Sequence, residues 1–435
     1  MSDTSNFHLP DDYNAIKWYW LLKILVIISY SSFPMQDLYY SKKLDQYFPT
    51  RVDYLLYAHD GRGLGHVSRT TAVGLALKRL YPEARILLIT GSAKTQVMVG
   101  RGALDWIKLP SYQTVLTEGA SEGRDGESGF YKSVLGNLRA EMIAKMVEVL
   151  RPRCLLVDHN PVGKRQELRL ALEQGVATDC HWVLGLRAIV GEDKAVWTDE
   201  TARVVEDYYG EILWYGDRSV LGPASMERIG SHFARPAAEM GYVSRVRELA
   251  RFYEEEADTG EQLACTVSLP WFGPHTNSLL HNLYEVLDRL GEQHGRSHIY
   301  VERSRAQDVA ELFDSLPHCL VEPVGDRYIG SLLNSRVALI YGGYNSILDV
   351  LALATPALVV LRATRDREQQ VHLDLLQRSV GGALQVVDEV EASSRALEEA
   401  LRQLLAAKPG SSPPINLNGA GNTARHLHQL VQEQG

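Results

Sequence analysis

Cysteine is scarce in this chain, and its scarcity excludes two kinds of scaffold. The 435 residues include four cysteines, none of them in a C-x-x-C pair: Cys154, Cys180, Cys265 and Cys319. Structural zinc sites and disulfide frameworks need paired or regularly spaced cysteines. We therefore expect no metal site and no disulfide network, and a reducing cytoplasm as the compartment.

Basic charge is also in short supply. The chain has 45 Lys and Arg residues against 54 Asp and Glu residues, which gives a net charge of −9. Proteins that bind nucleic acid usually present a basic surface that neutralises phosphates. A nucleic-acid partner is therefore not expected. The apolar fraction of 45% and the charged fraction of 23% are typical of a globular protein.

No apolar run is long enough to span a bilayer comfortably. The most apolar window, residues 16–30, is short, contains Lys17 and Lys23, and lacks the basic flank of a signal peptide. The preferred interpretation is a helix or strand that packs on the protein or forms a homodimer contact. The alternative is attachment to a membrane surface through Trp18, Tyr19 and Trp20, which would make the protein peripheral to the membrane.

From residue 52 onward, apolar strand-like runs alternate with helical patterns, and glycine turns stand between them. This alternation predicts an α/β fold of doubly wound parallel sheets. It restarts after a boundary near residues 241–243, which is followed by a charged helix expected over 245–256. The expected parts are an extension (1–50), two α/β domains (51–240 and 241–410), and a linker with a terminal helix that packs back (411–435).

One stretch of the second half, residues 337–370, has the pattern of a phosphate site. An apolar strand ends at Gly342-Gly343, a helix follows, and a second strand leads into a loop rich in Arg, Glu and Gln. A glycine turn before a helix lets a phosphate approach backbone N–H groups and the positive end of the helix dipole. Asp349, one turn into that helix, is placed to bind ribose hydroxyls. The alternative is that the glycines are ordinary turn residues.

The first half has its own glycine loop, at Gly61, Gly63 and Gly65, followed directly by His66. The spacing is G-x-G-x-G-H and not G-x-G-x-x-G, and no acidic residue ends the second strand, so NAD binding is disfavoured. Further along, a polar run over 117–129 is expected to be a loop that is mobile or functional.

Two more polar residues are expected at a ligand-binding edge. Asp158 and His159 follow the apolar run CLLV, so they stand at the carboxyl end of a predicted parallel strand. Open α/β sheets bind their ligands at that edge.

The two glycine turns and the GGYNS…D…TPALVV…REQQ pattern resemble the GT-B nucleotide-sugar glycosyltransferases. The nearest likeness is to the MurG type of glycosyltransferase family 28 and related predicted bacterial glycosyltransferases. The resemblance covers the chain from about Asp53 to its end. It implies two Rossmann-like domains that face a cleft, the first for the acceptor and the second for the donor.

The resemblance also implies roles for individual residues. His66 would face the reaction centre from the acceptor side, and Asp158 with His159 matches a V-D-H-x-P element of the nearer relatives. The positions implied for donor binding are Gly342, Gly343, Asn345, Ser346, Asp349, Glu368, Gln369 and Gln370. One departure is that the usual second glycine-rich loop is replaced by SLPWFGPHTNS, whose only glycine is Gly273. Thr276 and Arg365 are possible phosphate contacts there and in the polar loop.

The expected reaction is transfer of a sugar, UDP-linked, to an unknown acceptor, by a single displacement with inversion. Neither a cofactor nor a metal is expected, because helix N–H groups can stabilise the leaving diphosphate and no D-x-D pair ends a predicted strand. The base is left open between His66, since the unperturbed pKa of a histidine is close to neutrality, and the Asp158–His159 pair. The alternatives are a nucleotide-sugar epimerase of the same fold and a non-catalytic protein that binds sugar nucleotides.

Overall fold

The computed structural model describes residues 51–59, 64–117, 120–126, 128–175, 179–188, 196–254, 262–362, 368–407 and 414–433. The predicted N-terminal extension, with its apolar window at 16–30, lies outside these residues. Within the described part of the chain, no helix is both long and apolar enough to cross a membrane.

The first half is built on a parallel sheet of seven strands in the order β3-β2-β1-β6-β7-β8-β9. The central strands β1 and β6 are buried at every residue, as expected of parallel strands that are covered on both faces. The strands are β1 (Tyr54–Ala58), β2 (Ile86–Thr90), β3 (Asp105–Lys108), β6 (Cys154–Asp158), β7 (His181–Arg187), β8 (Tyr209–Tyr215) and β9 (Ala237–Glu239).

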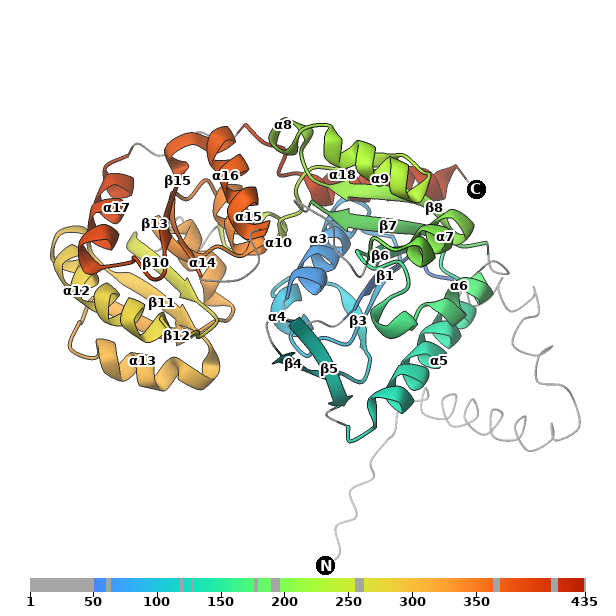
Figure 1. Cartoon of the computed structure of the whole chain (residues 1–435), viewed down its shortest axis with the longest axis horizontal. Coiled ribbons are helices and arrows are strands. Elements are labelled where there is room, and N and C mark those ends of the chain that lie inside the picture. Colours follow the sequence, from blue (N-terminus) through green and yellow to red (C-terminus); the bar gives the residue numbers. More distant parts are fainter. Residues whose placement is uncertain are drawn as a thin grey trace, which may run out of the picture. The chain divides into compact units, whose positions relative to one another are not determined.

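Helix α3 (Gly65–Leu80) is the central helix of this half, and every residue from Val67 to Leu77 is buried. It packs against strands β1 and β2 and also contacts α10 (Arg245–Leu249) and the last helix, α18 (Gly419–Gln432). The end of the chain, red in Figure 1, thus lies beside the N-terminal sheet. The other helices are α4 (Thr95–Val99), α5 (Lys132–Leu150), α6 (Arg169–Gly175), α7 (Asp199–Tyr208), α8 (Arg218–Leu221) and α9 (Ala224–Phe233).

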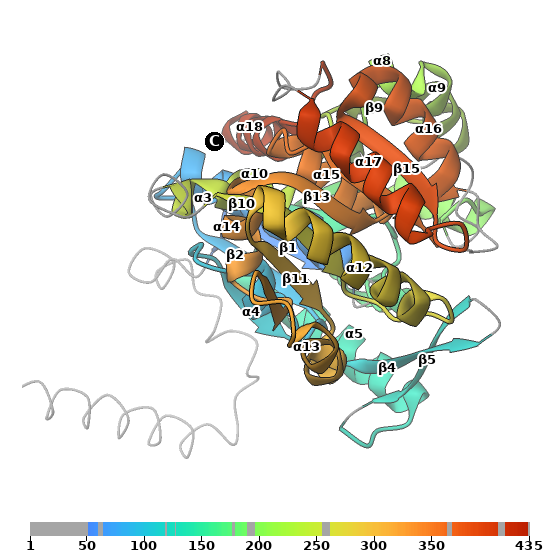
Figure 2. The same cartoon turned by 90° about the vertical axis from the view of Figure 1, so that its left-hand side faces the viewer.

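The second half repeats the plan with a parallel sheet of six strands in the order β12-β11-β10-β13-β14-β15. The strands are β10 (Leu263–Leu269), β11 (Ser297–Val301), β12 (Cys319–Pro323), β13 (Ser335–Tyr341), β14 (Ala357–Leu361) and β15 (Leu384–Asp388). Helices α12 (Thr276–His294), α13 (Ala306–Phe313) and α17 (Ser394–Ala406) pack on strands of this sheet, with α12 beside α17 (Figure 2). The remaining helices are α14 (Arg327–Leu333), α15 (Tyr344–Ala352) and α16 (Glu368–Val380).

Both sheets have the strand order of a Rossmann fold. In each, the first strand lies between the second and the fourth strand of that sheet. From the first strand, the chain adds two strands on one side and then crosses over to add the remaining strands on the other side. The reversal occurs between β1 and β6 in the first half and between β10 and β13 in the second. Ligands of doubly wound sheets bind outside the carboxyl ends of such a strand pair. The predicted pair of doubly wound parallel sheets is therefore confirmed, and the topology gives one candidate position in each sheet.

Two predicted segments were wrong. The polar run 117–129 was expected to be a loop, but its main part is strand β5 (Ala120–Gly126), which pairs antiparallel with β4 (Tyr112–Thr117). A separate two-stranded ribbon needs no apolar alternation, so the pattern did not indicate it. The charged helix expected over 245–256 is shorter: α10 ends at Leu249 and a 3-10 turn follows over Ala250–Phe252.

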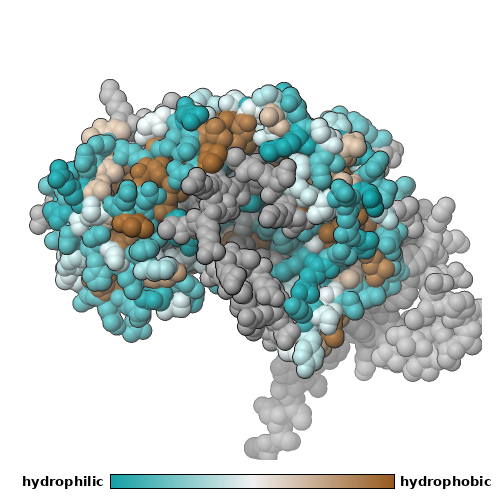
Figure 3. All heavy atoms as spheres, viewed as in Figure 1, coloured by the Kyte–Doolittle hydropathy of each residue, from teal (hydrophilic) through white to brown (hydrophobic). Residues whose placement is uncertain are grey.

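Hydrophilic residues predominate on the described surface of the face drawn in Figure 3, with hydrophobic residues in small groups. Three large exposed hydrophobic side chains lie close together in sequence at the start of α5: Phe130, Tyr131 and Val134.

Candidate functional site

A compact polar cluster lies at the point where strand order reverses in the N-terminal sheet. Asp158 is the last residue of β6, and His59 directly follows its neighbour β1. Helix α3 begins at Gly65 on the connection that leaves β1, so His66 and Arg69 are carried on its first turns. Strand ends and a helix start therefore bring these side chains together at the ligand-binding edge.

The Asp158 carboxylate is held by two partners on α3. Nδ1 of His66 lies 2.6 Å from Oδ2 of Asp158. Arg69 donates through Nε to Oδ1 at 3.1 Å and through Nη2 to Oδ2 at 2.8 Å. The side chains of Asp158 and Arg69 are 2% and 3% exposed, whereas that of His66 is 22% exposed. His66 is therefore the member of this triad that solvent or a ligand can reach.

These contacts set the charge of the triad. Burial by itself would raise the pKa of Asp158, but the Arg69 guanidinium and the His66 hydrogen bond outweigh it and hold the pKa well below its ordinary value. Burial lowers the pKa of His66; its hydrogen bond to Asp158 opposes this shift, and the positive charge of Arg69 adds to it. Near neutral pH, the triad thus consists of a carboxylate, a guanidinium and a neutral imidazole.

This arrangement prepares His66 to act as a base. Because an ionised carboxylate can only accept, Nδ1 of His66 must carry the hydrogen of the His66–Asp158 bond. Nε2 is then the nitrogen with the free lone pair. The bidentate Arg69 fixes the carboxylate, which in turn fixes the imidazole ring and its tautomer. The triad therefore has a base, an orienting carboxylate and a residue that positions the carboxylate.

Two further histidines flank His66. The rings of His59 and His66 have centroids 3.8 Å apart, and those of His159 and His66 have centroids 5.8 Å apart. Burial, followed by the nearby His66, lowers the pKa of His59 well below its ordinary value, so His59 is neutral. His159 has a φ of 69° and donates its backbone N–H to the Gly185 carbonyl at 2.7 Å. A non-glycine residue in that region marks a constrained turn, and such turns gather at functional sites.

A second buried ion pair, in the same half of the chain, gives a useful contrast. Arg139 donates to Glu167 at 2.5 and 2.7 Å, and both side chains are fully buried. Arg139 also donates to the Pro110 carbonyl at 2.7 Å, and the Tyr57 hydroxyl donates to Glu167. This pair is enclosed on all sides, so it ties α5 to the sheet. The Asp158 pair instead ends in the partly exposed imidazole of His66.

Of the three glycines in the glycine loop, only Gly65 belongs to the described residues. Gly61 and Gly63 lie outside the described residues, while Gly65 is the first residue of α3. A Cβ at Gly65 would lie 3.4 Å from Nη1 of Arg69 and 3.6 Å from Nδ2 of Asn345. Asn345 belongs to the first turn of α15, so the starts of α3 and α15 are neighbours. The two helices whose N-termini the sequence indicated as ligand-binding therefore meet.

At the predicted donor turn, the backbone of Gly342 packs closely against the neighbouring strand β14. β13 ends at Tyr341, and α15 starts at Tyr344 after Gly342 and Gly343. A Cβ at Gly342 would lie 2.8 Å from Cδ2 of Leu361, whereas a Cβ at Gly343 would be no closer than 3.8 Å to its nearest neighbour, Oγ of Ser346. Gly342 is thus required for packing, and Gly343 leaves room at the helix N-terminus.

Alanine at these two positions should separate packing from binding. We expect Gly342→Ala to lower the free energy of unfolding by about 1–3 kcal/mol, because a methyl group there overpacks the contact with Leu361. Gly343→Ala should leave stability within about 1 kcal/mol but weaken binding of UDP, because its methyl group stands where a phosphate would approach. Thermal unfolding and calorimetric titration measure the two effects. Equal Tm losses in both variants would contradict this assignment.

Asp349 is buried and already has protein partners. Its Oδ1 accepts from the Ser244 hydroxyl at 3.4 Å, on the turn that begins α10. Burial raises the pKa of Asp349 to about 6, against the opposing positive charge of Arg245. This carboxylate therefore faces the segment between the two sheets, and a contact with ribose hydroxyls would have to share it with Ser244. Ribose binding by Asp349 stays a prediction.

The Thr276 hydroxyl is engaged inside the protein. It accepts from the Gly273 N–H at 2.9 Å, lies 2.8 Å from the Tyr341 hydroxyl and donates to Oε1 of Glu389 at 3.1 Å. The Tyr341 hydroxyl also donates to that oxygen, at 2.6 Å. A buried carboxylate beside Thr276 repels phosphate, so the predicted phosphate contact through this hydroxyl is disfavoured. Arg365, the other predicted contact, lies outside the described residues.

The predicted sugar-binding residues begin helix α16. Glu368, Gln369 and Gln370 form its first turn. Gln370, the one whose side chain is described, is exposed and donates to Oδ1 of Asp374 at 3.1 Å. Their contacts with a donor sugar stay predictions.

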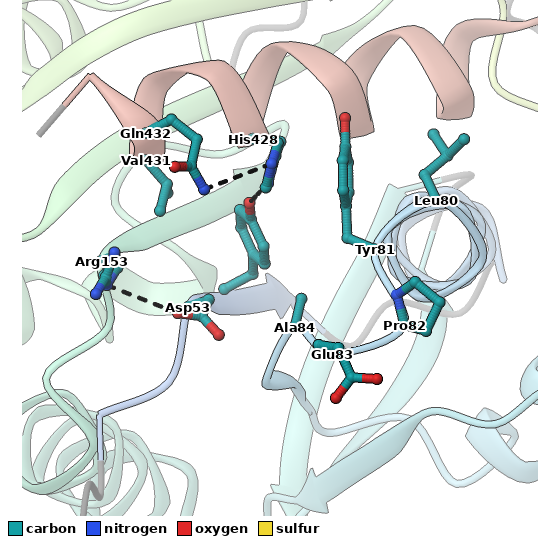
Figure 4. A pocket seen from close by; sticks show the side chains of 11 residues that line it. Asp53, Leu80, Tyr81, Pro82, Glu83, Ala84, Arg153, His428, Val431 and Gln432 are labelled. Carbon is teal, nitrogen blue, oxygen red and sulfur yellow. Dashed lines mark hydrogen bonds and ion pairs between the residues drawn. The ribbon is translucent and has the colours of Figure 1, made fainter. Parts of the chain in front are cut away.

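A separate cavity lies at the edge of the N-terminal sheet opposite to the triad (Figure 4). Its volume is about 410 Å³, and its lining includes Asp53, Arg153 and the stacked rings of Tyr81 and His428. Asp53 and Arg153 precede β1 and β6, so the cavity is at the amino ends of the strands. That edge is not where doubly wound sheets bind ligands, and the cavity contains none of the triad.

The structure brings together His66, Asp158 and His159, three residues that the sequence indicates as candidates. The structure adds Arg69 and His59 to this cluster, which were not predicted. Arg69 carried a usable signal, because it follows His66 by three positions in G-H-V-S-R and therefore lies on the same helix face. Among the described residues, no group of His, Cys, Asp and Glu side chains is arranged to hold a metal ion.

No protein-family model matches the sequence, and no curated protein does. Solved structures do. A putative UDP-N-acetylglucosamine 2-epimerase from Listeria monocytogenes is 11% identical with a TM-score of 0.59, over 88% of this chain and 96% of that one. The UDP-GlcNAc 2-epimerase from Methanocaldococcus jannaschii is 12% identical with a TM-score of 0.58, over 86% and 99% of the two chains. MurG from Acinetobacter baumannii is 11% identical with a TM-score of 0.49, over 88% and 99%. At such identities, similarity establishes the fold alone, and it confirms the predicted two-domain GT-B fold.

Proposed function

We propose that this protein, which has the GT-B fold, is a glycosyltransferase that moves a sugar from a UDP-sugar to an acceptor hydroxyl or amine, with His66 as the base. The observation that carries the proposal is the triad, in which a partly exposed imidazole is oriented by a buried carboxylate that Arg69 holds in place. The triad lies at the carboxyl edge of the first sheet. The predicted donor turn, Gly342 and Gly343, lies at the carboxyl edge of the second sheet, directly after β13.

In the proposed reaction, the acceptor nucleophile loses its proton to Nε2 of His66 as it attacks the anomeric carbon. The bond from that carbon to the diphosphate oxygen breaks on the opposite face, and UDP leaves with the electron pair. One displacement inverts the anomeric configuration. The N–H groups at the start of α15 would stabilise the charge on the leaving diphosphate, so the proposed mechanism requires no metal.

Calorimetric titration with UDP-N-acetylglucosamine, UDP-glucose and UDP-galactose tests the donor half of the proposal. Binding of at least one sugar nucleotide is expected, and Asp349→Ala is expected to weaken it if the carboxylate contacts ribose. Product formation over a panel of acceptors then tests transfer. No binding of any sugar nucleotide, together with an unchanged result for Asp349→Ala, would refute the proposal.

The pH profile should show an unusually acidic lower limb. As the pH falls through the pKa of His66 in the folded protein, the imidazole takes up a proton and can no longer act as a base. Because burial lowers that pKa, we expect kcat/KM to stay high at pH values where an ordinary histidine, with a pKa of about 6.5, is already half protonated. A lower limb centred at or above pH 6.5 would argue against His66 as the base.

A second candidate, a nucleotide-sugar epimerase, is favoured by one observation. Three imidazoles lie side by side, because the ring of His66 contacts those of both His59 and His159. They would supply more than one group for proton transfer. Proteins of the same fold include UDP-GlcNAc 2-epimerases. Incubation of UDP-N-acetylglucosamine without acceptor, followed by NMR, distinguishes the two candidates. A new UDP-sugar would indicate epimerisation. A donor that stays unchanged without acceptor but is consumed when acceptor is added would indicate transfer.

A third candidate, a non-catalytic protein that binds sugar nucleotides, is favoured by the contact between Thr276 and Glu389, which puts a carboxylate where a phosphate contact was predicted. Nucleotide binding without turnover over the same donors and acceptors would support it.

A further inference from the structure

The short helix α10 contacts both of the helices on which the proposed reaction depends. It lies in the segment that joins the two sheets, and its neighbours include α3 and α15. Helix α3 carries His66 and Arg69 of the triad, and α15 begins at the predicted donor turn. The contacts of α10 with these two helices therefore bear on the distance between the proposed base and a bound donor.

On the side of the first half, polar contacts of buried side chains hold α10. Arg79, in the last turn of α3, donates to both carboxylate oxygens of Glu248, at 2.8 and 2.9 Å. The Glu248 side chain is 3% exposed, so this bidentate pair is partly shielded from water. Arg245, which is also buried, donates through Nη1 to the carbonyl of Met98 in α4 at 3.2 Å. Helix α10 is thus attached to the half of the chain that contains the triad.

On the side of the second half, the carboxylate of Asp349 in α15 holds the start of α10. Its Oδ1 accepts from the Ser244 hydroxyl at 3.4 Å, and the backbone N–H of Val246 also donates to the carboxylate. Ser244 is the N-cap of α10, so the same hydroxyl accepts from the Arg247 N–H. Asp349 and Ser244 are both buried. Little of this carboxylate is left for a ribose to reach.

The two roles open to Asp349 make different demands on its surroundings. A carboxylate that binds ribose hydroxyls needs oxygens that face the ligand, whereas Asp349 is buried and bonds to the first residues of α10. The positive charge of Arg245 on that helix attracts the carboxylate, and a helix dipole favours a negative charge at the helix start. The observed contacts are those of a residue that joins two helices.

We propose that Asp349 is a positioning residue and not a ribose ligand. Its carboxylate holds the start of α10, and through α10 it fixes the donor turn of α15 relative to the base on α3. This inference rests on the proposed function, since it names how two parts of the same site are kept at a fixed distance. A displacement of about 1 Å between reacting groups can cost roughly 100-fold in rate, so this contact acts on kcat.

The test compares the full-length wild-type protein with Asp349→Asn, Ser244→Ala, the double variant and a control. Asn keeps the shape of Asp349 and removes its charge, and Ser244→Ala removes the hydroxyl that bonds to Asp349. Ser393→Ala is the matched control for loss of an N-cap, because Ser393 caps α17 and accepts from the Ala396 N–H at 3.3 Å. Tm is measured for every variant.

Two functional measurements are made on each protein. Calorimetry gives the affinities for UDP, 2′-deoxy-UDP and 3′-deoxy-UDP. The release of UDP from UDP-N-acetylglucosamine, with the acceptor that gives the highest turnover in the panel, gives kcat.

Asp349→Asn and Ser244→Ala are each expected to lower kcat by about 10-fold or more. The double variant should be little worse than the more impaired single variant, because both changes break the same contact. The affinity for UDP should stay close to that of the wild type, and the preference for UDP over the two deoxy analogues should be unchanged. Ser393→Ala should lose as much Tm as Ser244→Ala and keep the wild-type kcat.

Loss of the preference for UDP over either deoxy analogue in Asp349→Asn would overturn the inference, because the carboxylate would then bind ribose. Equal kcat in Ser244→Ala and Ser393→Ala would also overturn it. Failure of the proposed function has a different signature, which is no UDP binding and no UDP release by the wild-type protein. Denaturant unfolding needs no nucleotide, and strictly additive stability losses in the double variant would show that Asp349 and Ser244 are not coupled.

Discussion

Replacing His66 with Gln is expected to lower kcat by about 10²–10⁴-fold, the usual contribution of a positioned general base. The amide of Gln can donate to Asp158 as Nδ1 of His66 does, and Arg69 keeps its two bonds to the carboxylate. The buried pair is therefore preserved, and the fold should be retained. Binding of UDP-sugar should be unchanged, because the loss is confined to proton transfer from the acceptor.

His281→Gln provides the matched control, since His281 is an exposed histidine on α12 whose Nδ1 bonds to the Asn277 carbonyl of its own helix. That variant should keep full activity. If His66→Gln retained kcat within a factor of three, the base would have to be another group, with His59 or His159 the next to be replaced.

Replacing Asp158 with Asn is expected to affect both activity and stability. The Arg69 guanidinium would then be buried without its counter-charge, which costs about 3–5 kcal/mol of unfolding free energy. His66 would lose the acceptor that fixes its tautomer, so kcat should fall by roughly 10²–10⁴-fold in the fraction that remains folded. Denaturant unfolding and steady-state kinetics measure the two losses separately.

Asp53→Asn is the appropriate comparison for stability. Asp53 pairs with Arg85 and Arg153 near the amino end of β1, where the side chains of those arginines are 42% and 37% exposed. Exposed pairs of this kind contribute about 0–1 kcal/mol. A similar loss of stability in the two variants would mean that Asp158 is not the buried anchor described above.

Much of the fold could be predicted because its signals are local. Strands such as YLLYA and CLLVD are short apolar runs, and glycine turns separate them from helical patterns. The ribbon formed by β4 and β5 could not be predicted, because Ala120–Gly126 has no apolar periodicity and is a strand only through its pairing with Tyr112–Thr117. Strand order could not be predicted either. Strands β1 and β6 pair residues about 100 positions apart, and nothing in the sequence of either strand indicates which strand lies beside it.

The candidate site was predictable to the same extent. Asp158 and His66 each followed an expected strand or glycine loop, so their edge of the sheet could be inferred. Their contact could not, because it depends on the β1–β6 pairing. The same pairing explains why His59 was missed: a histidine at a strand end has no meaning until a second strand brings partners to it. Asp349 shows the limit in the other direction, since its burial against Ser244 follows from the docking of α10 and not from its spacing after the glycines.

The most direct test of the proposed mechanism is a crystal structure with UDP-N-acetylglucosamine bound. We expect a diphosphate at the start of α15, near Gly343, and the anomeric carbon of the sugar facing Nε2 of His66 from the side away from the diphosphate. A donor bound away from Gly343, or an anomeric carbon faced by a side chain other than His66, would contradict the proposed mechanism.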